Sequence, residues 1–212
     1  HIPCDAKEQE IRYDYFDCAS NEANYRPLLN ESVRVLWRGV YQGIVGPLDS
    51  TIGPFPSTTK PGFRVPFEAK ISGNSGRSIW STDSIRKGQL VWTSKTQTTC
   101  FHTGDQYRRF IWSLPPDIVC DSMQFSYVKE FPSVGHGRNL KVCLDTDESG
   151  YINNGGLSSL MPANIGCPEG MSRKDCDYGG LMYALRDIDE GEELLCDYQD
   201  FYVEGGWEAL GL

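Results

Sequence analysis

Short runs in which apolar and polar residues alternate dominate the chain, and this pattern is typical of half-buried strands. Strands are predicted at residues 33–46 (a strand, a turn and a second short strand), 63–71, 78–94 (with a turn at 86–88), 122–131, 139–146, 179–188 and 193–198. Residues 104–114 instead place apolar and aromatic side chains at helical spacing, and this predicted helix ends before Pro115 and Pro116. Many short strands around one helix predict an α+β fold that is mainly β and built from small sheets.

The segment 47–62 is rich in Pro, Ser, Thr and Gly, which predicts a linker or a long surface loop. It closes an N-terminal extension and linker at residues 1–62 and precedes a main domain at 63–202, after which a short C-terminal segment follows at 203–212. A chain of 212 residues is long enough for one domain with a full-sized core. The sequence therefore predicts one main domain rather than two.

The formal net charge of the chain is −9 at neutral pH, and this argues against direct binding to nucleic acid because phosphate binding needs a basic face. An acidic surface tolerates or attracts a basic protein or peptide instead. No run of about 18 uninterrupted apolar residues is present, which argues against a membrane-spanning segment. The predicted partner is therefore a protein or peptide, and neither nucleic acid nor a membrane.

Eight cysteines are many for a reducing compartment, and their even number permits disulfides. No two of them form a C-x-x-C pair, so the usual spacing of a zinc site is missing and no metal is predicted. Cys143 and Cys196 lie in apolar, strand-like runs and are predicted to be buried free thiols.

Two pairs of cysteines bracket short segments, Cys4 with Cys18 and Cys167 with Cys176, and each pair is either a local disulfide or two free thiols. Asn30 begins an N-x-S sequon, which is a glycosylation site only if the protein is secreted. The compartment stays open between the nucleus or cytoplasm and the secretory pathway, which the eight cysteines and the sequon would suit.

Three loop segments contain residue types that carry chemistry. Residues 72–80 ("SGNSGRSIW") join a glycine loop to a strand, and glycine lets a ligand approach the backbone closely. Residues 153–164 ("NNGGLSSLMPAN") offer amide donors and acceptors that suit the amine and carboxylate of an amino-acid-like ligand. Residues 186–202 ("RDIDEGEELLCDYQDFY") turn at a glycine and then reach a phenol. Each segment alone is also an ordinary turn, so the information lies in their order and spacing.

In this order and spacing the three segments resemble the motifs of the SET-domain protein methyltransferases. Residues 76–91 match the family's glycine loop, strand and turn, with Ser78 where a second glycine is frequent. The start of the family's asparagine motif, N-H-S-C-x-P-N, aligns with Asn153 and Asn154. Residues 186–198 match the last motif, R-D-I-x-x-G-E-E-L-x-x-x-Y, and this match is the most specific of the three.

The resemblance covers about residues 63–202 and implies a SET-type fold of several small sheets with a short helical insert. It implies transfer of the sulfonium methyl group of S-adenosyl-L-methionine to a lysine of a protein, such as a basic histone tail. The lysine must lose its proton before it can attack, and a poorly solvated channel beside a sulfonium favours the neutral amine. Tyr198 is the implied catalytic residue, whose phenol would orient that amine.

The same resemblance assigns the remaining site residues. The residues implied to hold the cofactor are Gly76, Arg77, Ser78, Trp80, Asn153 and Asn154. The residues implied to line or close the substrate channel are Tyr151, Phe201, Tyr202 and Trp207, the last of these in the C-terminal lid segment.

Two positions depart from the family pattern. Asn154 stands where the family motif has histidine, and the strand at 140–145 lacks the tyrosine that many active members carry there. The rings that could replace that tyrosine are Tyr127, Tyr151, Tyr183 and Tyr202.

Two other functions remain open on the sequence alone. The changed asparagine motif and the missing strand tyrosine are compatible with a catalytically inactive SET-like module that binds a protein or peptide. The eight cysteines and the sequon are compatible with a secreted binding protein stabilised by disulfides. Binding of S-adenosylmethionine separates the first from an enzyme, and the number of free thiols tests the second.

Overall fold

The computed structural model of the protein describes residues 16, 18, 27–52, 62–73, 76–133, 137–156, 161–172, 176 and 180–212. Its α-helices in this part of the chain are α1 (Glu31–Val45), α2 (Gly104–Trp112), α3 (Pro116–Gln124) and α4 (Gly206–Ala209). The strands are β1 (Phe67–Ser72), β2 (Gly76–Ser81), β3 (Leu90–Thr93), β4 (Thr98–Phe101), β5 (Ser126–Phe131), β6 (Asn139–Asp145), β7 (Asn153–Asn154), β8 (Ile165–Gly166), β9 (Leu181–Ala184) and β10 (Leu195–Cys196). The short 3₁₀ helices are η2 (Glu148–Tyr151) and η3 (Tyr198–Asp200). None of the helices in these ranges has the length and apolar character needed to cross a bilayer.

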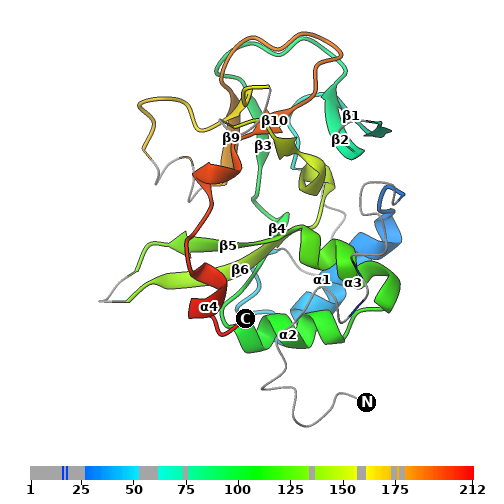
Figure 1. The fold of residues 1–212 in the computed structure, drawn as a ribbon, viewed down its shortest axis with the longest axis vertical. Helices are drawn as coiled ribbons and strands as arrows, with labels where there is room; N and C mark the ends of the chain where they lie inside the picture. Colours follow the sequence, from blue (N-terminus) through cyan, green and yellow to red (C-terminus); the bar gives the residue numbers. More distant parts are fainter. Residues whose placement is uncertain are drawn as a thin grey trace.

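The strands form small separate sheets, so the predicted α+β fold with a β majority is confirmed. β4, β6 and β5 make one antiparallel sheet in this order, and β3, β9 and β8 make another. β1 and β2 form an antiparallel hairpin, whereas β7 and β10 pair in parallel. Figure 1 shows the β4–β6–β5 sheet and the four labelled helices toward one end of the molecule, and the other labelled strands toward the opposite end.

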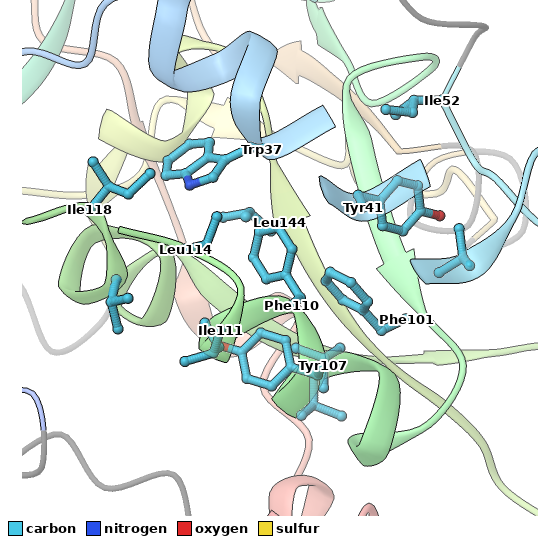
Figure 2. Packing of buried hydrophobic residues seen from close by; sticks show 14 of the residues in the cluster. Trp37, Tyr41, Ile52, Phe101, Tyr107, Phe110, Ile111, Leu114, Ile118 and Leu144 are labelled. Carbon is cyan, nitrogen blue, oxygen red and sulfur yellow. The ribbon is translucent and has the colours of Figure 1, made fainter. Parts of the chain in front are cut away.

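The first hydrophobic core lies between the helices and the β4–β6–β5 sheet. Trp37 and Tyr41 of α1 and Phe110 of α2 meet Phe101 of β4 and Leu144 of β6 there (Figure 2). These five side chains are at most 1% exposed. The ring centroids of Tyr41 and Phe101 lie 5.2 Å apart in an edge-to-face contact. The helix α1 is therefore part of the folded core, although it lies in the region predicted as an extension.

A second hydrophobic core lies among the remaining strands. Ile79 of β2, Val91 of β3 and Ile165 of β8 are fully buried in it. Leu29 and Phe125 pack against both cores, so the two are joined where these side chains lie.

Residues 33–46 do not form the predicted strand, turn and strand, because they belong to α1. Asn30 caps the first turn by accepting a hydrogen bond of 3.1 Å from the backbone, and Gly46 follows the last turn with a φ of 81°. Trp37 and Tyr41, four residues apart, share the buried face. The valines of this segment obscured the helical period, since β-branched residues favour strands.

The predicted helix at 104–114 is confirmed as α2, which ends before the two prolines. Pro116 then begins α3, since a missing N–H costs nothing at the first helical position. Residues 122–124 belong to α3 rather than to the strand predicted at 122–131, so β5 begins only at Ser126.

Six cysteines of the described residues form disulfides, which join Cys18 to Cys120, Cys100 to Cys143 and Cys167 to Cys176. Cys143 is therefore not the predicted free thiol, because it pairs with Cys100 across the β4–β6 ladder. Cys18 is bonded to α3 instead of to Cys4, which lies outside the described residues. The local pair in the loop at 167–176 is a disulfide, and Cys196 is a buried free thiol as predicted.

A buried ion pair joins the two ends of the fold. Arg77 of β2 donates two hydrogen bonds, of 2.8 and 3.0 Å, to Asp121 of α3, and the two side chains are 3% and 4% exposed. The guanidinium also lies over the rings of Phe125 and Tyr151, at 4.7 and 5.3 Å from their centroids. The two charges compensate each other and fix β2 against the helical end of the molecule.

Replacing Arg77 alone should lower the free energy of unfolding by about 3–5 kcal/mol, because Arg77→Met leaves the Asp121 carboxylate buried without its partner. The double variant Arg77→Met, Asp121→Leu should recover most of this loss, since it removes both charges. Urea unfolding of the wild type and the two variants measures the three stabilities. A double variant that is as unstable as Arg77→Met would show that lost packing, and not the stranded charge, causes the destabilisation.

Thiol labelling under denaturing, non-reducing conditions should modify Cys196 and leave the six cysteines of the three disulfides unmodified. Intact-protein mass spectrometry after alkylation gives the count, with a reduced sample as the control. Labelling of all eight without reductant would contradict the disulfide pairing.

Candidate active site

The three predicted motifs meet at residues 191–196, which lie between β2 and β7. On one side, the backbone of Leu194 donates a hydrogen bond of 2.8 Å to the carbonyl of Ile79 in β2. On the other side, β10 continues the same segment and pairs in parallel with β7. The turns of the first and last motifs also run side by side, joined by a bridge between Ile85 and Ile188 (Figure 1). The fold thus gathers segments that are far apart in the sequence.

The side-chain amide of Asn153 touches all three motifs. Its Nδ2 donates to the Arg77 carbonyl at 3.1 Å and to Glu193 Oε1 at 2.9 Å. Glu193 is only 7% exposed, and a buried carboxylate needs such donors. Asn153 therefore holds β2 against the last motif.

Asn164, at the end of the asparagine motif, binds the backbone of the last motif. Its Nδ2 donates to the Glu193 carbonyl, and its Oδ1 accepts from the Leu195 N–H, both at 2.8 Å. Asn164 is 1% exposed, so these backbone groups are satisfied inside the protein.

Tyr198 is fixed at both ends to residues 152–154. Its backbone N–H donates to Asn154 Oδ1 at 3.1 Å, and its hydroxyl donates to the Ile152 carbonyl at 2.8 Å. Because the hydroxyl hydrogen is used in this bond, the phenolic oxygen can serve as an acceptor for another group. Burial raises the pKa of the Tyr198 phenol, so the group stays neutral at physiological pH.

A cavity of about 270 Å³ lies beside Tyr198. The aromatic side chains of its wall are Trp92, Phe125, Tyr127, Tyr198 and Phe201. The rings of Tyr127 and Tyr198 each lie 5.5 Å from that of Phe201, centroid to centroid, so the three form a continuous surface. Aromatic walls with phenol oxygens suit an alkyl amine or its cation.

Asp145, at the end of β6, places a carboxylate on the cavity wall. Its Oδ1 accepts hydrogen bonds from the Thr98 hydroxyl and, at 3.4 Å, from the Tyr127 hydroxyl. Within the described ranges Oδ2 has no hydrogen-bond partner, and the carboxylate forms no ion pair. Burial, and then the neighbouring Asp147 carboxylate, raise the pKa of Asp145 to about 6.

Asp147 is buried, and both of its oxygens are satisfied. Oδ2 accepts from the Gly62 N–H at 2.7 Å and from Trp92 Nε1 at 3.0 Å. Oδ1 accepts from the backbone N–H and the hydroxyl of Ser149, at 3.1 and 2.6 Å. Asp147 is thus a structural carboxylate that ties β3 to the start of η2.

The predicted cofactor residues of β2 lie beside the site, but most of their side chains have structural partners. Arg77 is held in the core by its ion pair. Trp80 Nε1 donates to Ser78 Oγ at 2.7 Å, and the Trp80 ring lies 4.2 Å from the Lys70 ammonium. Gly76 has a φ of 66°, which side chains with a Cβ rarely adopt. The main chain near Gly76 and the ring of Trp80 are the groups of this motif that suit a ligand.

Of the four predicted channel residues, Phe201 lines the cavity and the other three do not. Tyr151 is buried, and its hydroxyl accepts a hydrogen bond of 2.6 Å from the backbone just before α1. Trp207 of α4 packs on Tyr107 in the first core, with 5.8 Å between ring centroids. Tyr202 is 67% exposed. Tyr151, Tyr202 and Trp207 therefore lie outside the wall of this cavity, and their role in a substrate channel stays a prediction.

Lys129, Asp145 and Ile152 are among the cavity residues that were not predicted from the sequence. A signal for Asp145 was present, because it is the charged residue at the end of the apolar run 139–145. Among the rings considered as replacements for the missing strand tyrosine, Tyr127 is the one that lines the cavity. It lies opposite the strand concerned, since β5 pairs with β6.

The family model of the SET domain matches residues 76–199, which are more than half of the chain. The chain therefore belongs to the SET-domain family. This match spans all three motifs, so the family and the fold predicted from them are confirmed. A comparison with curated proteins gave no match.

Solved structures similar to this chain include the Neurospora SET domain protein DIM-5, a histone lysine methyltransferase, and CpSET8 from Cryptosporidium. DIM-5 is 17% identical with a TM-score of 0.41, and the match covers 86% of this chain and 74% of DIM-5. CpSET8 is 16% identical with a TM-score of 0.39, and the match covers 89% of this chain and 90% of CpSET8. Both similarities concern the fold.

Replacing Asp145 with asparagine should change how stability depends on pH. The folded protein binds the Asp145 proton more tightly than the unfolded chain, so the wild type loses this stabilisation as pH rises from about 4 through about 6. Asp145→Asn cannot lose it, so its free energy of unfolding relative to wild type should rise by about 2–3 kcal/mol over this range. Urea unfolding at several pH values between 4 and 8 measures the difference. A difference that stays constant with pH would mean that Asp145 ionises like an exposed aspartate.

Proposed function

We propose that the protein is an S-adenosyl-L-methionine-dependent protein lysine N-methyltransferase. The observation that carries this proposal is the placement of Tyr198, whose backbone is bonded to Asn154 and whose phenol is bonded to the Ile152 carbonyl on the wall of an aromatic cavity. Membership of the SET family supports the reaction class.

When bound, S-adenosylmethionine would supply an electrophilic methyl group. The groups that would hold it are the main chain near Gly76, the Trp80 ring, and the segment Asn153–Asn154. Amides can pair with the amine and carboxylate of the methionine part, and an indole ring suits adenine. The hydrogen bond from Tyr198 to Asn154 makes the cofactor segment a direct neighbour of the tyrosine, and this neighbourhood fits the proposed roles.

The cavity would bind the side chain of the substrate lysine against Tyr127 and Phe201. Poor solvation favours the neutral amine, which is the form that attacks. The hydroxyl hydrogen of Tyr198 is bonded to the Ile152 carbonyl, so the phenol does not compete for the lone pair of the amine. Its oxygen can instead accept an N–H from the amine and fix the direction of that lone pair, and such positioning is a large part of enzymatic rate enhancement.

The proposed substrate is a basic protein or peptide, of which a histone tail is one example. A net charge of −9 supports attraction of a cationic partner. The Asp145 carboxylate on the cavity wall supports a positively charged side chain at the site itself. The same acidity supports the proposal that nucleic acid is not bound directly.

The compartment is proposed to be oxidising, in line with the secretory alternative. The described residues form three disulfides, and such bonds persist mainly outside reducing compartments. The sequon residue Asn30 is exposed at the start of α1, where a glycan would meet solvent.

A SET-like binding module without activity is the second candidate. The observation that favours it is that Asn153 and Asn154 use their side-chain amides to brace β2 and Tyr198. Calorimetry with S-adenosylmethionine separates the two candidates. Absence of binding at millimolar cofactor would exclude the enzyme and leave the binding module.

Tyr198→Phe should lower the rate of methyl transfer by about one to three orders of magnitude, as expected for the loss of one positioned polar group. The measurement is incorporation of tritiated methyl groups into histones and into a lysate. Affinity for S-adenosylmethionine should stay nearly unchanged in calorimetry, which controls for folding. Turnover equal to that of the wild type would show that Tyr198 is not the catalytic tyrosine.

A further inference from the structure

Placing a carboxylate on a cavity wall that is otherwise rich in aromatic rings lowers the stability of the free protein. Asp145 is half-buried, and it shares the wall with Tyr127, Tyr198 and Phe201. Its Oδ1 is hydrogen-bonded, whereas Oδ2 has no partner among the residues that the structure describes. An ionised carboxylate in such surroundings destabilises the free protein unless a cation compensates it.

The groups around Asp145 compensate its charge only in part. Asp147 adds a second negative charge and is already saturated by its own hydrogen bonds. Cys196 also lines the cavity, and burial raises the pKa of its thiol, so it stays neutral. Lys129 lines the cavity as well, and its charge partly offsets the rise in the pKa of Asp145, but its ammonium lies over the ring of Phe131 and no ion pair joins it to Asp145.

We propose that Asp145 binds the ammonium group of a lysine side chain in this cavity and makes the site select a cationic amine. The proposed function is used only to identify the amine as a lysine of a protein. The ring faces of Tyr127, Tyr198 and Phe201 favour a cation, because aromatic faces carry negative potential. Asp145 Oδ2 provides a charged acceptor, and the Tyr198 oxygen provides a second one.

Asp145 is in this scheme a positioning and specificity residue, because it acts on the substrate before the methyl group is transferred. It recruits the charged form of the amine and holds the nitrogen within the aromatic wall. The ammonium then releases one proton to solvent, and the neutral amine attacks the methyl group. The hydrogen bond of Asp145 to the Tyr127 hydroxyl orients that phenol at the same time. Asparagine at position 145 would keep an acceptor for Thr98 and Tyr127 but would lose the charge.

The test uses n-butylammonium, which mimics the end of a lysine side chain, and n-butanol as its neutral analogue. Binding to the full chain is measured by ligand-observed NMR titration for wild type, Asp145→Asn and Asp117→Asn. Asp117 is exposed on the first turn of α3 outside the cavity wall, so this control makes the same charge change elsewhere. Near-ultraviolet circular dichroism verifies that each variant is folded.

Wild type and Asp117→Asn should bind n-butylammonium more tightly than n-butanol, and Asp145→Asn should bind it at least about tenfold more weakly, as for loss of a charge-assisted hydrogen bond. Equal binding by wild type and Asp145→Asn, equal binding of the two ligands by wild type, or no saturable binding would each overturn the proposal. The titration does not depend on methyl transfer. Asp145-dependent binding without any transferase activity would therefore contradict the proposed function and leave this inference standing. Transferase activity with unchanged binding in Asp145→Asn would contradict this inference and leave the proposed function standing.

Discussion

The position of residues 191–196 between β2 and β7 is the constraint on which the site depends. Hydrogen bonds from both neighbours satisfy part of this backbone. The side chain of Asn164 satisfies the Glu193 carbonyl and the Leu195 N–H. A buried backbone must be satisfied in this way, so the segment has one position relative to its neighbours. Tyr198 lies two residues beyond this segment, so backbone pairing places it beside β7, and the bond of its hydroxyl to the Ile152 carbonyl fixes the phenol.

The carboxylates are compensated differently where β2 meets α3 and at the cavity. Asp121 has Arg77 as a bidentate partner, and Asp147 has hydrogen bonds to both oxygens. These two carboxylates tie together parts of the chain that have no backbone pairing. Asp145 has no ion-pair partner among the described residues, and burial and then the Asp147 charge raise its pKa to about 6 although the charge of Lys129 opposes the rise. A carboxylate that costs stability in the free protein is more readily explained by binding than by folding.

The sequence predicted the features that depend on local pattern and motif order. The last motif, residues 186–198, was specific enough to give the family, and the helix before Pro115 was evident from its period. The sequence could not give contacts that depend on tertiary placement. Cys143 pairs with Cys100 because β4 happens to lie beside β6, and Tyr151 leaves the cavity because its hydroxyl binds the chain before α1. The strand predicted at 33–46 failed because packing of Trp37 and Tyr41 outweighed the strand preference of valine.

The directions of the hydroxyl hydrogens support the proposed selectivity of the cavity. The hydrogen of Tyr198 is bonded to the Ile152 carbonyl, and that of Tyr127 is bonded to Asp145, so both phenol oxygens present lone pairs to a guest. Together with Asp145 Oδ2 they are acceptors, and an ammonium group carries three donors and no acceptor. A neutral alcohol of the same length would bring one donor and no charge. The fold thus favours a cationic amine through hydrogen bonds made within the protein before any substrate arrives.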